Sequence, residues 1–291
     1  MKVCGFTFVR NGILYDYPFL ESILSLLPIC DKVLVSVGNS DDETKQAIQM
    51  LNSPKIEIMD SIWDDSLREN GKVLAVETDK VFQAIPALYD WAIYLQADEV
   101  IHEQALPEIK NAIECHHHNP TVEGLLLKYL HFYGSYDYVS EAYSWCRQEV
   151  RVIRNDKNIF SYKDAQGFRK KPNQKLRVKL VDGFIYHYSY VRNPYRLKNK
   201  LTKFHSYWHP NEWIEKNLHH DPKFDFGDTE ILTRFQGSHP QVMTHRIKNM
   251  DWTYERDLRT QRSPMKHRIR KLVENLTGWR MGEYRNYKLV K

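Results

Sequence analysis

The sequence predicts an α/β fold, with a mixed, mainly parallel sheet flanked by helices and a helical C-terminal extension. Predicted strands and helices alternate through the first hundred residues, which is typical of a parallel sheet with right-handed crossovers. The apolar segment Trp91 to Leu95 predicts a buried strand that ends just before Asp98 and Glu99. The last hundred residues show helical spacing of apolar side chains instead.

Composition sets the class of protein. The chain has 291 residues, of which 42% are hydrophobic and 27% charged, as expected for one large domain or one domain with an extension. A net charge of +5 is too small for a nucleic-acid-binding signature. The four cysteines lie far apart in the sequence and form no CxxC pair, so the sequence indicates neither a zinc site nor a disulfide framework. We therefore expect the protein to reside in a reducing compartment. No apolar run suits a signal peptide or a membrane span, so we expect a cytoplasmic protein, with peripheral contact at a membrane surface left open.

The elements of the first hundred residues follow from local pattern. Lys2 to Arg10 is rich in β-branched and aromatic residues and predicts a strand, and Tyr17 to Leu27 has the spacing of a helix. Asp31 to Thr44 predicts a strand, a turn and an acidic helix start. Lys55 to Asp60 predicts a third strand, and Lys72 to Ile85 predicts a helix that leads into the strand before Asp98.

The second half changes character after residue 105. A helix (Glu108 to Cys115) and alternating strands (Gly124 to Gly134 and Gln148 to Asn155) are followed by two short β runs between Lys175 and Pro194. Eleven basic residues lie between Arg169 and Lys203. Such a run usually means a solvated face, but a site for a diphosphate would use it too.

The final predicted helix begins after Ser263 and Pro264 and stops at Gly278. One stripe of it is apolar, and its other face is basic. We interpret the stripe as docking on the sheet domain, with attachment to an anionic bilayer as the alternative. The apolar residues of this stripe are Met265, Ile269, Leu272, Val273 and Leu276.

Three short motifs occur in a recognisable order. They are VRNG (9–12), VGNSDDET (37–44) and LQADEV (95–100), and neither a GxGxxG nor a GxxxxGK[ST] motif accompanies them. The motifs resemble those of glycosyltransferases with the GT-A fold, of the broad family 2 type, over about residues 1 to 105. The resemblance implies a catalytic domain over 1–194, with a nucleotide-binding half (1–105) and an acceptor half (106–194), and a mainly helical extension over 195–291 packed on it.

The resemblance also implies an activity. Such enzymes move a sugar from a nucleotide-diphosphate sugar to a hydroxyl of a glycan or lipid-linked saccharide, in an inverting reaction that depends on Mn²⁺ or Mg²⁺. Asp98 and His187 would hold the cation. Two positions depart from the family pattern, since Val37 stands where an Asp commonly closes the second strand and Gln96 replaces the first acid of the DxD motif.

The remaining site residues are assigned by position in the resembling family. Asp164 would act as the general base that accepts the acceptor hydroxyl proton, with Glu149 as the alternative. The nucleotide-sugar would be bound by residues at the ends of the first two strands and near the DxD position, with Lys72 reaching the phosphates. These binding residues are Arg10, Asn11, Asp42, Lys72 and Gln96.

Two other classes of protein remain open. The loss of an acid at Gln96 favours a non-catalytic carbohydrate-binding or scaffold relative of these enzymes. A nucleotidyltransferase on a related sheet would need a second acidic metal ligand and usually a glycine-rich, basic first loop, which VRNG is not. No nucleic-acid partner is expected for any of the three.

Overall fold

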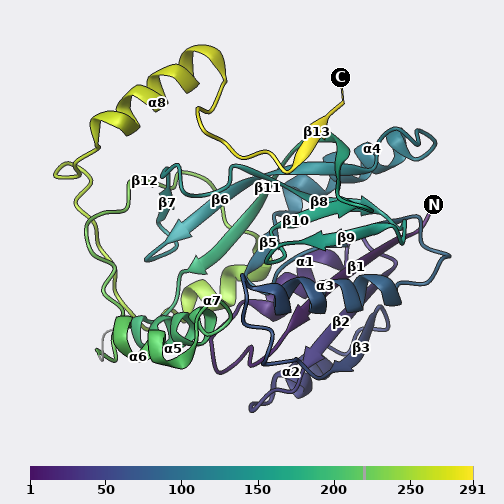
Figure 1. Ribbon diagram of the computed structural model, residues 1–291, viewed down its shortest axis with the longest axis horizontal. Coiled ribbons are helices and arrows are strands. Elements are labelled where there is room, and N and C mark those ends of the chain that lie inside the picture. The colour runs from purple at the N-terminus through teal and green to yellow at the C-terminus, as the bar shows by residue number, and fades with distance from the viewer. Residues whose placement is uncertain (219–220, 291) are drawn as a thin grey trace.

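The computed structural model describes residues 1–218 and 221–290 as a curled, mixed β-sheet with helices on both faces (Figure 1). The main sheet has the strand order β3-β2-β1-β4-β8-β6-β11-β10-β9. In chain order the elements are β1 (Val3–Val9), α1 (Phe19–Leu26), β2 (Lys32–Gly38), α2 (Thr44–Met50), β3 (Ile56–Ser61), α3 (Lys72–Ala84), β4 (Trp91–Tyr94), β5 (Glu99–Ile101), the 3₁₀ turn η1 (Glu103–Ala105), α4 (Leu106–His116), β6 (Gly124–Tyr133), β7 (Tyr138–Ser140), β8 (Gln148–Arg154), β9 (Ile159–Tyr162), β10 (Gly167–Lys170), β11 (Gln174–Tyr190), α5 (Pro194–His205), α6 (Asn211–Asn217), β12 (Leu232–Arg234), the 3₁₀ turn η2 (Gln241–Met243), α7 (Thr244–Lys248), α8 (Met265–Thr277) and β13 (Tyr287–Leu289).

The sheet is parallel only in part. Strands β3, β2, β1 and β4 run parallel to one another, as the alternation of strands and helices predicts. Beyond β4, strand β8 runs antiparallel to both of its neighbours, while β6 and β13 run parallel to β11. The predicted mixed α/β fold is confirmed, but the mainly parallel character holds for the first half of the sheet and not for the second.

The two faces of the sheet carry separate cores because side chains alternate along each strand. Val3 and Val9 of β1 join a core with α1, α2 and α4, whereas Phe6 and Phe8 join a second core with α3 and the β9–β10 hairpin. In the second core the ring of Phe82 lies 5.5 Å from that of Phe6. Both cores support β1, β2 and β4, and one of the three sequence motifs lies at the end of each of these strands.

The C-terminal third is built into the sheet. Helix α5 starts at Pro194, where the Asn193 side chain accepts a hydrogen bond from the Tyr195 amide. Strand β12 pairs with β7, and β13 pairs with the start of β11. The two β runs expected between 175 and 194 are one long strand with a register shift between Leu180 and Phe184. The division into domains at residue 194 stays a prediction.

Helix α8 corrects one interpretation of the sequence. The predicted apolar stripe does not dock on the sheet, because none of the residues of α8, all of which the structure describes, is buried. The helix contacts the rest of the chain through its polar face instead. Figure 1 shows it at the periphery of the molecule. The reason is that the polar face finds ion-pair partners on the β7–β8 segment, as described below.

Across residues 1–218 and 221–290, no helix has both the length and the apolar character needed to cross a bilayer. The cytoplasmic location stays a prediction.

The second core gives a test of the fold. Replacing Phe82 by Ala leaves a void between Phe6 and Phe168 and should lower the free energy of unfolding by about 3–5 kcal/mol. Urea denaturation measures the change, with the exposed Met50 replaced by Ala as the matched control, for which we expect less than about 0.5 kcal/mol. Equal effects of the two substitutions would contradict the packing described.

Candidate active site

A cavity of about 420 Å³ lies where β1 and β4 end. In α/β sheets, ligands bind outside the carboxyl ends of the parallel strands. Helix α5 and the β9–β10 loop contribute further walls. The cavity gathers six of the residues predicted for the site from segments far apart in the chain, namely Arg10, Gln96, Asp98, Glu149, Asp164 and His187.

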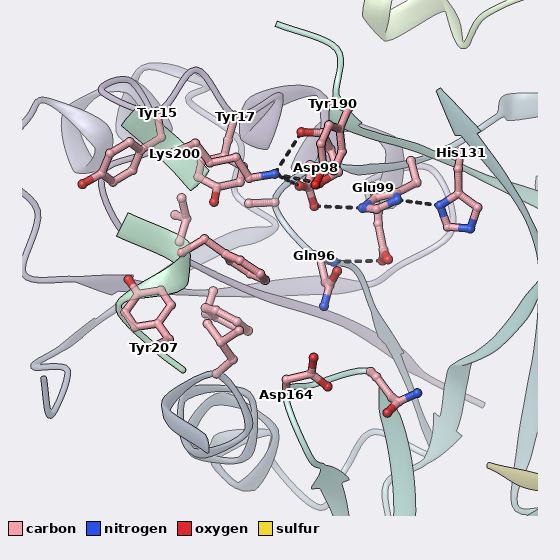
Figure 2. A pocket seen from close by; sticks show the side chains of 18 of the residues that line it. Tyr15, Tyr17, Gln96, Asp98, Glu99, His131, Asp164, Tyr190, Lys200 and Tyr207 are labelled. Carbon is pink, nitrogen blue, oxygen red and sulfur yellow. Dashed lines mark hydrogen bonds and ion pairs between the residues drawn. The ribbon is translucent and has the colours of Figure 1, made fainter. Parts of the chain in front are cut away.

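Asp98 is the carboxylate delivered by the end of β4, and it is surrounded by cationic and imidazole groups. Only 6% of Asp98 is exposed. Its Oδ2 lies 3.1 Å from Lys200 Nζ and 3.9 Å from Arg192 Nη2, and its Oδ1 lies 3.6 Å from His187 Nε2. Figure 2 shows the Lys200 side chain reaching Asp98 across the wall of the cavity. Asp98 is therefore already neutralised by the protein.

Lys200 comes from α5 and is itself 4% exposed. Its ammonium donates to Asp98 Oδ2, to the Ser189 carbonyl at 3.0 Å and to Ser189 Oγ at 2.7 Å, so each of its N–H groups has an acceptor. The sequence analysis placed Lys200 in a basic run without singling it out. A signal was present, because Lys200 shares a helical face with Leu197 and Phe204, at spacings of three and four residues.

The electrostatics of this pair follow from burial. Burial alone would raise the pKa of Asp98, but Lys200, His187 and Arg192 together outweigh it and hold that pKa well below its usual range. Burial, followed by repulsion from Arg192, lowers the pKa of Lys200 to about 7, against the attraction of Asp98. Arg192 is completely buried and lies over the ring of Tyr17, 4.8 Å from its centroid. An anion entering the cavity would favour the ammonium form of Lys200.

The predicted metal ligands lie together, but their surroundings do not fit a resident divalent cation. Lys200 Nζ already lies on the carboxylate of Asp98, and an ammonium and a metal ion at one carboxylate repel each other. Nowhere in the described ranges 1–218 and 221–290 do three or more His, Cys, Asp or Glu side chains form a group that could hold an ion. Binding of Mn²⁺ or Mg²⁺ by Asp98 and His187 stays a prediction, and it requires Lys200 to move.

Glu99, next to Asp98, points away from this cluster into a second ion pair. Its two oxygens accept hydrogen bonds from Arg151 at 2.8 and 2.9 Å, and Tyr129 donates to it at 2.8 Å. Glu99 Oε2 also accepts from the backbone N–H of Gln96 at 3.0 Å. Each of the two adjacent carboxylates thus has its own buried cation, and the Glu99 pair fixes the turn that presents Asp98.

Asp164 lies in the loop between β9 and β10 and lines the cavity. Its neighbours Lys163 and Ala165 both have left-handed backbone, with φ of 55° and 63°, although neither is glycine. Gln96 Nε2 donates to the Ala165 carbonyl at 3.4 Å and so ties this loop to the end of β4. Figure 2 shows Gln96 between Asp98 and Asp164. Strained backbone of this kind is common where a loop must aim a functional side chain.

The two candidate bases differ in their surroundings. Burial raises the pKa of Asp164, which makes its carboxylate a stronger base. Burial raises the pKa of Glu149 further, to about 8, and Glu149 Oε2 has no hydrogen-bond partner among the described residues. Near neutral pH, Glu149 therefore holds its proton while Asp164 is the better acceptor.

Three predicted nucleotide-binding residues do not line the cavity. Asn11 exchanges two hydrogen bonds with Asp41, at 2.7 and 3.0 Å. Asp42 accepts from the Leu14 amide at 2.7 Å and thereby fastens the loop after β1 to the start of α2. Lys72 is exposed at the first turn of α3. The motif residues Asn11 and Asp42 hold the loop that shapes the cavity, and their contact with a nucleotide stays a prediction.

The rim near β1 carries a second cationic group. Arg10 Nη1 and Lys203 Nζ lie 2.8 and 3.6 Å from the same oxygen of Asp65. The rings of Trp63 and Tyr207 lie beside them, 6.0 Å apart. The sequence analysis missed Trp63 and Tyr207 and placed Lys203 only within a basic run, because only the fold brings α5 and the segment after β3 together.

The opposite end of the cavity is aromatic, with His131 of β6 and Trp145 of the β7–β8 segment among its lining residues. Trp145 stacks on His131 with ring centroids 4.8 Å apart, and His131 Nδ1 lies 2.8 Å from His187 Nδ1. Burial, followed by His187, lowers the pKa of His131 well below its usual value, so its imidazole is neutral. A flat aromatic surface of this kind suits a sugar ring.

Comparisons with known proteins give partial likeness only. No protein-family model and no curated protein matches this sequence. Among solved structures, S. aureus TarS 1–349 is similar with a TM-score of 0.39 and 13% identity over 70% of this chain and 64% of that chain, just under two thirds of its length. The 4-diphosphocytidyl-2C-methyl-D-erythritol synthase of Anaerococcus prevotii has a TM-score of 0.37 and 8% identity over 62% of this chain and 87% of that chain.

A third similar structure is glucosyl-3-phosphoglycerate synthase from Mycobacterium tuberculosis in complex with Mn²⁺, uridine diphosphate and phosphoglyceric acid. Its TM-score is 0.31, with 13% identity over 46% of this chain and 44% of that chain. The likeness to these structures is structural, partial and at low sequence identity. At these TM-scores we base the function of this chain on its own cavity.

The Asp98–Lys200 pair can be tested by its coupling. Replacing Lys200 by Met leaves a buried carboxylate short of its main partner and should lower the free energy of unfolding by about 3–5 kcal/mol. Asp98→Asn combined with Lys200→Met should be less destabilising than the sum of the two single changes, because the double variant has no unpaired charge at these positions. Denaturant unfolding of all four proteins measures the coupling, and additive effects would contradict a direct pair.

Glu149 gives a pH-dependent prediction. A carboxyl whose pKa rises from 4.5 unfolded to about 8 folded binds its proton more tightly in the folded state, so stability falls as pH rises between these values. Glu149→Gln removes this loss, and its advantage over wild type should grow by up to about 1.4 kcal/mol per pH unit in that window. Urea unfolding across the window checks it; a constant difference would show that Glu149 is ionised throughout.

Proposed function

We propose that the protein is a glycosyltransferase that moves a sugar from a nucleotide-diphosphate sugar to a hydroxyl of a glycan or lipid-linked saccharide. The observation that supports this most directly is the polarity of the cavity. One wall carries Lys200, Arg10 and Lys203, and the β9–β10 side carries Asp164. A donor with an anionic leaving group and an acceptor hydroxyl that must lose a proton need these two features on facing sides.

The cationic wall suits a diphosphate. Lys200 and Arg192 both lie within 4 Å of Asp98 Oδ2, and Arg10 and Lys203 both lie within 4 Å of one oxygen of Asp65. Each cluster has two cations for one carboxylate and so leaves a net positive charge when Lys200 is in its ammonium form. Negative charge grows on the diphosphate as it departs, and fixed positive charge in a partly buried cavity stabilises that state more than the same charge in water would.

In this proposal Lys200 occupies the place that the family pattern gives to a divalent cation. The ammonium lies 3.1 Å from Asp98 and is anchored by Ser189, so it is held without reorganisation at the moment of reaction. Gln96, in place of the first acid of the motif, fits this arrangement, because an amide adds no second negative charge next to a single ammonium. The rings of Trp63 and Tyr207 at the rim would form the walls of the nucleoside position. The ring of Trp145 would contact the acceptor sugar.

Asp164 is the proposed general base. It faces the cavity from a loop whose shape is fixed by Gln96, and its raised pKa strengthens it as a base. Glu149 is the alternative assigned from the sequence, and its protonated state near neutral pH suits it instead to donate a hydrogen bond to a substrate oxygen.

A panel of sugar nucleotides tests the class of activity. The wild-type protein is mixed with each donor, and release of nucleoside diphosphate and transfer to oligosaccharide or lipid-linked acceptors are followed. Donor-dependent release of nucleoside diphosphate is the expected result. In a parallel mixture of nucleoside triphosphate and sugar phosphate, release of inorganic pyrophosphate would indicate a nucleotidyltransferase. Saturable glycan binding without any turnover would indicate the scaffold alternative.

The base assignment yields a quantitative prediction. Asp164→Asn keeps the shape of the side chain but removes its capacity to accept the proton, so kcat should fall by about 10²–10⁴ with a small change in KM. Asp156→Asn, in the turn before β9 and outside the cavity lining, is the matched control, with kcat expected to stay close to wild type. A larger loss for Glu149→Gln than for Asp164→Asn would transfer the role to Glu149.

A further inference from the structure

We propose that α8 docks the protein on an anionic lipid bilayer through its exposed apolar stripe. This inference goes beyond the proposed transfer reaction and does not depend on it. Four large apolar side chains of the helix are mostly exposed. They are Met265 at 67%, Ile269 at 51%, Leu272 at 60% and Leu276 at 76%, followed by Trp279 at 53% just beyond the helix.

The orientation of α8 is fixed by its polar face. Lys271 Nζ lies 3.1 Å from Glu141 Oε1, and the ring of His267 hydrogen-bonds the Glu141 carbonyl at 3.2 Å. Glu274 accepts from Tyr143 at 2.6 Å and pairs with Arg147 at 3.3 Å. Because these contacts hold the polar face against the β7–β8 segment, the apolar stripe must point outward.

The outward face has the composition of an interfacial helix. Met265, Ile269, Leu272 and Leu276 follow one another at spacings of four, three and four residues, which puts them on one stripe. Lys266 and Arg268 flank the stripe and are exposed. Amphipathic helices of this kind lie in the membrane surface, with apolar residues among the acyl chains and basic residues at anionic headgroups. Trp279 at the end of the helix suits the same depth.

The charges favour a bilayer over a second copy of the chain. Helix α8 has four basic residues and a single acidic one, Glu274, which its contacts with Arg147 and Tyr143 already use. Two such stripes packed face to face would bring Lys266 and Arg268 of both copies together without a carboxylate from the helix to neutralise them. Anionic headgroups supply that missing charge.

The position of α8 connects this surface to the cavity. A smaller cavity of about 180 Å³ lies under the helix, lined by Lys271 and Glu274, and it shares His131, Trp145 and Cys146 with the larger one. If the proposed transfer function holds, docking of α8 places the aromatic acceptor end of the active site near the bilayer. That arrangement would favour a lipid-linked acceptor over a free glycan.

Vesicle flotation tests the proposal with the purified chain of 291 residues. Wild-type protein should float with vesicles of phosphatidylglycerol and phosphatidylcholine and stay behind with pure phosphatidylcholine. Ile269→Glu combined with Leu272→Glu should abolish flotation, and Lys266→Gln combined with Arg268→Gln should weaken binding roughly fivefold for each charge removed. Met50→Glu places the same charge at an exposed apolar residue of α2 and should float like wild type.

Two results would overturn the proposal. One is equal flotation of wild type and the Ile269→Glu, Leu272→Glu protein, or flotation of neither. The other is a wild-type dimer in analytical ultracentrifugation without lipid that becomes a monomer in this variant, because the stripe would then cover a second copy. All substituted side chains are exposed, so the midpoint of thermal unfolding of each variant should stay at the wild-type value. A lower midpoint would reveal a variant that is defective in folding. Sugar-nucleotide turnover without lipid, measured in parallel, separates failure of this proposal from failure of the transfer function.

Discussion

The buried contact between Asp98 and Lys200 is the constraint on which the site depends. It joins the end of β4, in the first hundred residues, to α5 in the C-terminal third. A carboxylate with 6% exposure is costly to ionise without a partner, and so is a lysine with 4% exposure. The attraction between the two charges offsets the cost of burying each of them, and Ser189 completes the hydrogen bonding of the ammonium. Closing this contact brings α5 over the cavity as one of its walls.

The same contact decides what chemistry the cavity supports. The protein itself surrounds Asp98 with positive charge before any ligand arrives, since Lys200 and Arg192 lie near Oδ2 and His187 lies near Oδ1. A family pattern read from strand ends would place a metal ion there. The structure places a lysine from a helix a hundred residues later in the chain. Positive charge lies at the cavity in either case, but only a metal ion must be recruited from solution.

Local pattern predicted the strands and helices of the first half because each has one buried face and a clear period. It also predicted that Asp98 would follow the end of a strand, whereas Asp164 was assigned by its position in the resembling family. Both residues line the same cavity. Lys200 could not be chosen from eleven basic residues, since the choice depends on which face of α5 meets β4. The helical spacing of Lys200 with Leu197 and Phe204 was the available signal.

Helix α8 shows the converse difficulty. Its period and its stop at Gly278, where φ is 68°, are evident in the sequence, and the helix forms as predicted. The sequence does not show which face of the helix contacts the rest of the chain. Because an apolar stripe is usually buried, the pattern predicted docking through the stripe. Here the partners of the polar face, Glu141 and Arg147, lie on a segment that the sequence does not place beside α8. The direction of an amphipathic helix is a tertiary property, and only the fold specifies it.

The most direct test of the central claim is whether Mn²⁺ binds at Asp98. Electron paramagnetic resonance of free Mn²⁺ measures binding to the wild-type chain, alone and with the sugar nucleotide that the donor panel identifies. With Lys200 on the carboxylate, we expect no stoichiometric Mn²⁺ at this position in either state and donor turnover that persists in excess chelator. One Mn²⁺ bound per chain in wild type and lost in Asp98→Asn, with turnover abolished by chelator, would contradict the account.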